Sequence, residues 1–144
     1  MPKARVTARQ RQAVIQRANG CCEYCRSQAR FATQSFSVEH IIPRRQDGKT
    51  ELENLALACE GCNSHKHVKV TGRDPVTDDE VSLFHPRQQK WGHHFRWNDD
   101  FTLIVGLTPT GRATVDTLQL NRESLVNLRQ ILYAMGEHPP QIVD

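Results

Sequence analysis

The stretch Leu55-Ala56-Leu57-Ala58-Cys59-Glu60-Gly61-Cys62-Asn63, residues 55–63, runs from an apolar segment through two cysteines into a polar segment. A short apolar run that follows a polar loop is typical of a buried strand. The mostly polar residues 63–69, with two lysines and two histidines, predict a short helix after the second cysteine. The stretch therefore predicts a strand, a pair of thiols and a helix in close succession.

Two cysteine pairs of the form C-x-x-C are the strongest chemical signal in the chain. Cys59 and Cys62 form one pair, and Cys22 and Cys25 form the other. Two such pairs supply the four thiolates of a tetrahedral zinc site, whereas disulfides are rare in a reducing compartment. We expect a structural Zn²⁺ here, with redox chemistry or unliganded thiols as the alternatives. Cys21 could replace Cys22 as a ligand, but the two-residue spacing favours Cys22.

The 33 residues between the two pairs exceed the usual zinc-ribbon spacing, so we expect a folded insert there. Residues 31–42 have the β-branched and aromatic content of one or two short strands, and Pro43 ends that segment. The polar residues 44–54 predict an exposed loop that leads to the strand at residues 55–58. The predicted order is therefore strand, loop, strand and helix.

Four polar residues in and beside this insert provide the groups that phosphodiester hydrolysis requires. His40, with an ordinary pKa of about 6.5, can take a proton from water at neutral pH. Glu39 and the side-chain carbonyl of Asn63 are hard oxygen donors, which suit Mg²⁺ or Mn²⁺ better than zinc. Asn54 has a different expected role, because a buried amide can tie a loop backbone and hold His40 in place.

The ordered set C-x-x-C, E-H-I-I-P, N-L and C-x-x-C-N-x-x-K, within residues 22–66, resembles the HNH endonucleases. More narrowly, it resembles the branch in which a four-cysteine zinc site clamps the ββα-metal (His-Me) finger. The resemblance implies a small α+β fold, DNA as the substrate, a structural Zn²⁺ and a catalytic Mg²⁺ or Mn²⁺.

The resemblance also implies a role for each matched position. His40 would be the general base, while Glu39 and Asn63 would bind the catalytic ion. Asn54 would be the middle residue of the HNH set, and Lys66 would match a lysine near the phosphates. Two positions depart from the usual pattern, since Glu39 stands where the family often has Asp, and the third position is Asn63.

Three further residues are candidates beside this set. His67 follows Asn63 by one helical turn and is a candidate third ligand of the catalytic ion. Arg44 and Arg45 are candidate contacts to the nucleic-acid backbone, with a solvated loop as the alternative.

The pair Glu39-His40 raises a geometric question. Alternation along a strand sends the two side chains to opposite sides, so one regular strand cannot aim both at one phosphate. We therefore predict a bend or bulge of the backbone at His40, held by Asn54.

The flanks predict further elements. Thr7 and Gln10 form a capping box at the start of an N-terminal helix that ends by Gly20. Downstream, residues 101–105 and 112–118 flank a Pro- and Gly-containing turn and predict a β-hairpin. Asn121 is the expected N-cap of a final helix, which Gly136 ends.

An aromatic cluster of Trp91, Phe95 and Trp97 could stack on unpaired bases, but core packing is favoured by the apolar residues around it. Residues 71–79 contain Gly72 and Pro75 and form the expected boundary between two parts. The first part, residues 1–70, holds the N-terminal helix and the nuclease finger; the second, residues 71–144, is an extension.

The composition indicates the kind of partner and the compartment that suit the protein. Residues 1–50 hold ten Lys or Arg against three Asp or Glu, and the remainder holds nine against thirteen. A basic first third suits a polyanion such as DNA. No apolar run is long enough for a membrane helix, and the first residues lack the apolar segment of a signal peptide, so we expect a cytoplasmic protein without a membrane partner.

The resulting hypothesis is a metal-dependent HNH endonuclease that hydrolyses DNA. The alternative from another class is a non-catalytic zinc-ribbon module that binds nucleic acid, which explains the cysteines but gives Glu39, His40 and Asn63 no common purpose. A nuclease that acts on RNA or branched DNA is a third possibility. The sequence predicts no oligomeric state.

Overall fold

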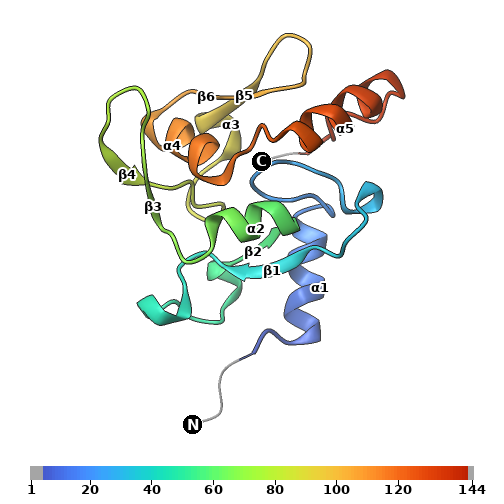
Figure 1. Cartoon of the computed structure of the whole chain (residues 1–144). Helices are drawn as coiled ribbons and strands as arrows, with labels where there is room; N and C mark the ends of the chain where they lie inside the picture. The colour runs from blue at the N-terminus through green and yellow to red at the C-terminus, as the bar shows by residue number, and fades with distance from the viewer. Residues whose placement is uncertain (1–4, 143–144) are drawn as a thin grey trace.

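The structure is a computed structural model that describes residues 5–142. The outer ends of the two predicted parts, residues 1–4 and 143–144, lie outside the described residues. Short antiparallel strands alternate with helices along the chain (Figure 1). The α-helices are α1 (Ala8–Arg17), α2 (Glu60–Lys66), α3 (Trp91–His94), α4 (Pro109–Leu118) and α5 (Glu123–Ala134). The strands are β1 (Ser37–His40), β2 (Leu55–Ala58), β3 (Thr71–Arg73), β4 (Glu80–Ser82), β5 (Phe95–Trp97) and β6 (Ile104–Gly106).

Each strand of the described chain pairs with one other, which gives the two-stranded sheets β1–β2, β3–β4 and β5–β6. The helices are not crossovers between parallel strands but pack beside these separate antiparallel pairs. The predicted α+β class is therefore confirmed.

The first sheet and α2 form the predicted ββα unit. β2 is buried at all four positions, as the apolar run at residues 55–58 predicts. The Cys59 thiol then accepts a hydrogen bond from the Cys62 amide and caps the N-terminus of α2. In Figure 1, α2 lies between the β1–β2 pair and α4.

The N-terminal helix α1 begins as predicted. The Thr7 hydroxyl accepts from the Gln10 amide and the Gln10 side chain accepts from the Thr7 amide, both at 3.0 Å, so the capping box is present. The helix ends at Arg17, and Gly20 follows with a φ of +69°. Val14 on this helix is fully buried, and α1 packs against β2.

The predicted bulge at His40 is wrong. β1 and β2 form an uninterrupted antiparallel ladder, in which Glu39 lies opposite Ala56 and His40 lies opposite Leu55. The chain leaves the ladder only after His40, at Ile41, whose amide donates to the Asn54 carbonyl at 2.8 Å. Glu39 and His40 therefore point to opposite sides of the sheet.

The predicted hairpin of residues 101–105 and 112–118 is also wrong. β6 pairs with β5 instead, and residues 109–118 form α4. The residues that suggested a turn begin a helix instead. Pro109 occupies the first turn of α4, and the Thr108 hydroxyl accepts from the Gly111 amide at 3.0 Å. Gly111 also allows a close approach, since a Cβ there would lie 2.1 Å from the His94 carbonyl oxygen.

Asn121 does not cap the last helix as predicted. The N-cap of α5 is Arg122, which makes no side-chain capping bond. The Asn121 amide instead binds both backbone groups of Ile104, accepting from its N–H at 2.8 Å and donating to its C=O at 2.9 Å. This contact joins the start of α5 to β6. Gly136, with a φ of +76°, follows the end of α5 as predicted.

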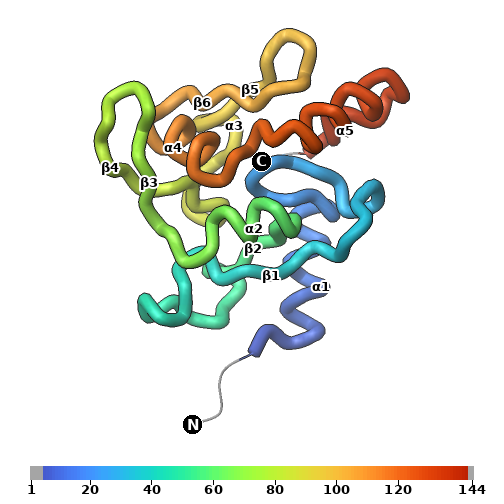
Figure 2. Tube along the Cα trace, viewed as in Figure 1, coloured from blue at the N-terminus to red at the C-terminus, as the bar shows by residue number. Residues whose placement is uncertain are grey.

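One hydrophobic core runs through both predicted parts of the chain. It includes Val14 and Leu57 from the first part, and Phe84, Phe95 and Leu118 from the second. Trp91 and Phe95 are buried, and Trp97 packs against the same core, so core packing of the aromatic cluster is confirmed. The tube in Figure 2 shows residues 71–142 gathered on one side of the finger. The segment at the expected boundary forms β3 and the turn toward β4.

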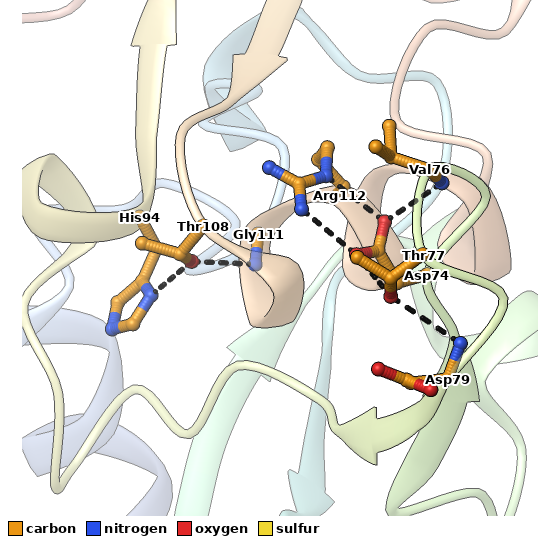
Figure 3. A network of polar contacts seen from close by, with 8 residues as sticks. All are labelled: Asp74, Val76, Thr77, Asp79, His94, Thr108, Gly111 and Arg112. Carbon is orange, nitrogen blue, oxygen red and sulfur yellow. Dashed lines mark hydrogen bonds and ion pairs between the residues drawn. The ribbon is translucent and has the colours of Figure 1, made fainter.

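A buried ion pair fastens the β3–β4 turn to α4 (Figure 3). Both Asp74 carboxylate oxygens accept from the Arg112 guanidinium, at 2.9 and 2.8 Å. The Val76 amide and the Thr77 hydroxyl complete the set of donors to Asp74. The Arg112 hydrogen bonds hold the pKa of Asp74 far below its usual range. The carboxylate is therefore charged in the folded protein near neutral pH.

Among residues 5–142, the helices are all too short and too polar to cross a membrane.

The Thr108 cap gives a test of the corrected element. We expect Thr108→Ala to lower the free energy of unfolding by about 0.5–2 kcal/mol, because it removes the cap of α4 and the hydroxyl that lies 2.7 Å from His94 Nδ1. Thr108→Ser keeps the hydroxyl and should stay close to wild type. Urea titration followed by far-UV circular dichroism measures both. Equal stability of the Ala and Ser variants would contradict the assigned cap.

Candidate functional site

The four cysteines of the two predicted pairs converge on one buried point. The ligand atoms of Cys22, Cys25, Cys59 and Cys62 all lie within 4.8 Å of one another. Cys25 Sγ and Cys59 Sγ are 3.6 Å apart. A tetrahedral ion with Zn–S bonds of about 2.3 Å requires sulfur atoms about 3.8 Å apart. The four thiols therefore fit a structural zinc ion.

Local backbone geometry prepares both pairs for this role. The Cys25 amide lies 3.5 Å from Cys22 Sγ, and the Cys62 amide lies 3.5 Å from Cys59 Sγ. Each C-x-x-C turn thus directs an N–H group at its first sulfur. Cys21 lies outside the cluster, since its thiol is directed at the Asn19 carbonyl. The choice of Cys22 over Cys21 is confirmed.

An arginine from the second part of the chain covers the cluster. Nη2 of Arg122 lies 3.6 Å from Cys59 Sγ, and both of its Nη atoms lie within 3.8 Å of Cys62 Sγ. Four thiolates and one Zn²⁺ carry a net charge of about −2, which a buried site must balance. Arg122 supplies one positive charge at contact distance.

Arg129 supplies a second positive charge near the cluster. It is buried, and it donates to the carbonyls of Leu120 and Thr102. Burial lowers the pKa of Arg129, while the Cys25 and Cys62 thiolates act in the opposite direction. The extension therefore covers the cysteine cluster and also places two positive charges near it.

Glu39 lies on the inner side of β1, in a buried polar group. One carboxylate oxygen lies 3.1 Å from Lys66 Nζ, and the other accepts from the Tyr24 hydroxyl. Burial raises the pKa of Glu39, and the Lys66 charge opposes that shift. Lys66 is only 1% exposed and also donates to the Ile41 carbonyl at 2.8 Å. In this arrangement the Lys66 ammonium group is directed at Glu39 and Ile41 and is buried from solvent.

The fit of a catalytic ion at Glu39 depends on Lys66. A carboxylate is a suitable donor for Mg²⁺ or Mn²⁺, but both oxygens of Glu39 already have protein partners. An ion can bind the Glu39 oxygen that faces Lys66 only after the Lys66 ammonium group moves away from it. A hollow of about 320 Å³ is lined by Lys66, Ile41 and His85 among others and lies beside this group.

His40 lies on the other side of β1 and is half-buried. Its Nε2 is 2.8 Å from the Thr50 hydroxyl. Burial, and then the nearby Arg44 charge, lower the pKa of His40, which favours the neutral imidazole near pH 7. If Nε2–H donates to Thr50, the Nδ1 lone pair is left to accept a proton.

Asn54 ties the loop between the two strands, as predicted for a buried amide. Its Oδ1 accepts from the Ile42 amide at 2.9 Å, and its Nδ2 donates to the carbonyls of Ile42 and Lys49. Gly48 is needed in the same loop, because a Cβ there would lie 1.7 Å from the Ile42 carbonyl oxygen. The loop that presents Thr50 to His40 is thereby held in one shape.

The remaining candidates are more exposed. Asn63 is half-buried, and its side-chain amide has no hydrogen-bond partner within residues 5–142, so its side-chain oxygen can act as a ligand. His67 is the C-cap of α2, with a φ of +50°, and its backbone N–H donates to the Asn63 backbone carbonyl at 2.9 Å, so it stays a candidate ligand beside Asn63. Arg44 and Arg45 are exposed on a 3₁₀ turn that follows β1 (Arg44–Gln46), beside His40.

Three residues with roles at the site were missed by sequence reasoning. Tyr24 binds Glu39 from within the first cysteine pair, Thr50 binds His40, and Arg122 covers the thiols. Each contact joins segments at least ten positions apart in the chain. No local pattern marks such residues, although Tyr24 between the two cysteines was the most visible of the three.

Residues 22–69 match the family model described as HNH endonuclease. The match covers about a third of the 144-residue chain and contains both cysteine pairs, His40, Asn54 and Asn63. It confirms the resemblance carried by the motifs and indicates a nuclease-type function for this segment. No curated protein matches the chain.

The cover of the cluster gives a prediction about metal retention. We expect Arg122→Gln to release zinc to a colorimetric chelator about 10–100 times more readily than wild type, because the thiolates lose a contacting charge. Arg96→Gln is the matched control, since Arg96 is exposed and, within residues 5–142, its side chain donates to the carbonyl of its neighbour Trp97. Far-UV circular dichroism before chelation checks that both variants are folded. Equal release from the two variants would refute the role of Arg122.

Proposed function

We propose that the protein is a metal-dependent HNH endonuclease that hydrolyses phosphodiester bonds of DNA. The match of residues 22–69 to the family supports nuclease chemistry. The observation that carries the proposal is the position of His40, half-buried at the end of β1, with one ring nitrogen bound to Thr50. A general base needs this combination of access and fixed orientation.

His40 is the general base of the proposed reaction. With Nε2–H donated to Thr50, Nδ1 takes a proton from the water that attacks the phosphate in line. Asn54 is a positioning residue, because its three side-chain bonds hold the loop that carries Thr50. The lowered pKa of His40 keeps the imidazole in the form that accepts a proton.

Glu39 and Asn63 would hold the catalytic Mg²⁺ or Mn²⁺ in this proposal. Because Glu39 and His40 point to opposite sides of the ladder, the ion and His40 would reach one phosphate only at the end of β1, where the chain leaves the ladder at Ile41. The ion supplies charge neutralisation for the phosphate and for the leaving oxygen when it is bound. Glu39 can serve as a ligand once the Lys66 ammonium group moves from its 3.1 Å contact into the neighbouring hollow. There Lys66 would be free to approach a phosphate, the contact expected from its match to the family pattern.

Arg44 and Arg45 are the proposed contacts to the DNA backbone. Both are exposed on the turn beside His40, and Arg44 is close enough to lower the pKa of that imidazole. Contacts of this kind fix the position of the duplex without selecting a base sequence. We expect weak sequence specificity. The cysteine usage supports a reducing compartment, and we propose the cytoplasm as the site of action.

One observation favours the alternative of a zinc-containing module that binds nucleic acid without cutting it. Both oxygens of Glu39 have buried partners, Lys66 and Tyr24, so the group is stable without an ion. In such a module the same buried pair would be purely structural. The two candidates differ in whether purified protein cleaves DNA.

Plasmid cleavage distinguishes the two functions. Wild-type protein should nick or cut supercoiled DNA with Mg²⁺ or Mn²⁺ and lose that activity in EDTA. His40→Ala should reduce cleavage by about 10²–10⁴-fold, because it removes the base, while zinc content and DNA binding remain. The control is His93→Ala, since His93 is exposed on α3.

Undiminished cleavage by His40→Ala would refute the mechanism. No cleavage by wild type with either ion, together with intact DNA binding, would favour the binding module. RNA and branched DNA tested side by side with duplex DNA decide the substrate class.

A further inference from the structure

A second cavity, separate from the His40 region, is lined by an unusual concentration of basic side chains. Its volume is about 320 Å³, at the lower end of the range of about 300–1,000 Å³ for ligand pockets. It lies where the end of α1, the first cysteine turn and the segment 84–91 meet. Four of its lining residues are basic, Arg17, Arg26, Arg87 and Lys90, and one is acidic, Glu23.

The negative charge of Glu23 offsets only part of the positive charge of these basic residues. One of its oxygens pairs with Arg87 Nη2, and the other accepts from the Leu57 amide at 2.8 Å. The carboxylate is therefore held by Arg87 and by β2, and Arg17 and Lys90 add further positive charge to the cavity. A concave surface of one sign concentrates ions of the opposite sign.

Arg87 carries an unsatisfied donor. Its Nη1 is buried and has no hydrogen-bond partner among the described residues. Buried polar groups nearly always have a partner in protein, water or ligand. Arg87 lines the cavity, and the Glu23 contact at Nη2 fixes the orientation of its guanidinium group.

Arg17 brings a second guanidinium into the same region. It donates to the Leu55 carbonyl, which anchors it to β2. Burial, and then the Arg87 charge, lower the pKa of Arg17. Two neighbouring guanidinium groups repel one another unless an anion lies between them. The Glu23 and Glu53 charges oppose this shift of the Arg17 pKa in part, and an anion in the cavity would add to their effect.

The remaining walls suit a group attached to such an anion. Trp91 lines the cavity, and the guanidinium carbon of Arg26 lies 4.8 Å from its ring centroid. Lys90 is exposed at the rim. The planar fork of arginine matches the oxygens of a phosphate in a bidentate manner.

We propose that this cavity is a phosphate-binding site. It lies at the edge of β2 that does not pair with β1: Arg17 and Glu23 bind Leu55 and Leu57 there, while β1 with His40 occupies the opposite edge. The site is thus distinct from the catalytic one and does not depend on the proposed function. Its ligand is a phosphate group, either of a nucleic-acid backbone, of a terminal phosphomonoester or free.

Direct binding tests the site. Tryptophan fluorescence, to which Trp91 in the cavity wall contributes, is followed while His40→Ala protein is titrated with three probes. The probes are inorganic phosphate, a short oligonucleotide with a 5′-phosphate and the same oligonucleotide with a 5′-hydroxyl. Equal binding of both oligonucleotides in competition with inorganic phosphate assigns a backbone phosphate. Binding of inorganic phosphate and of the 5′-phosphate oligonucleotide alone assigns a terminal or free phosphate.

Arg87→Lys, made in the same His40→Ala protein, is the decisive variant. Lysine can keep the ion pair with Glu23 but lacks the second nitrogen that Nη1 provides. We expect about tenfold weaker binding of the preferred probe. Arg73→Lys is the matched control, because Arg73 pairs with Asp78 on the exposed β3–β4 turn and should bind as the parent does.

Lys90→Gln, at an exposed position, provides a second variant in case Arg87→Lys does not fold. It should also weaken binding and reduce its dependence on salt. Failure of all three probes to bind would overturn the proposal. Binding that neither Arg87→Lys nor Lys90→Gln weakens would overturn it as well.

Discussion

Four thiols from two turns that are separated by 33 residues lie within 4.8 Å of one another. The surrounding strands and helices are arranged around this cluster. β1 and β2 are only four residues long and α2 is only seven, which is too little to form a stable core alone. A zinc ion on Cys22, Cys25, Cys59 and Cys62 would close the loop that contains both strands. It would supply folding free energy that so small a finger lacks.

The extension completes this cluster and the core beneath it. Arg122 reaches the thiols of the second cysteine pair, and the Trp91 indole donates to the Tyr24 carbonyl between the cysteines of the first pair at 3.0 Å. Phe84 packs edge-on against the Tyr24 ring, 6.5 Å between centroids. The same Tyr24 binds Glu39 through its hydroxyl. The cysteine cluster, the buried Glu39 group and the extension therefore share one set of contacts.

Sequence reasoning succeeded where a few neighbouring residues decide the structure. The spacing of the cysteines, the apolar run of residues 55–58 and the Thr7–Gln10 capping box are all local signals. It failed at residues 107–118, because Thr108-Pro109 followed by Gly111 suits a turn and also the first turn of a helix, and contacts with β6 decide between them. The bulge at His40 was inferred from a functional requirement rather than from the residues. The pairing of Glu39 with Lys66 could not be foreseen, since a lysine on α2 gives no local sign that its ammonium group is buried.

The most direct test of this account is chelation of zinc from the wild-type protein, with metal release and tryptophan fluorescence recorded together. The chain has two tryptophans, Trp91 and Trp97, and both lie in the extension. If the cysteine cluster holds the finger and the extension together, zinc loss should shift the emission to longer wavelength, and far-UV circular dichroism should fall in the same transition. Complete removal of zinc with unchanged emission and an unchanged unfolding midpoint would contradict it.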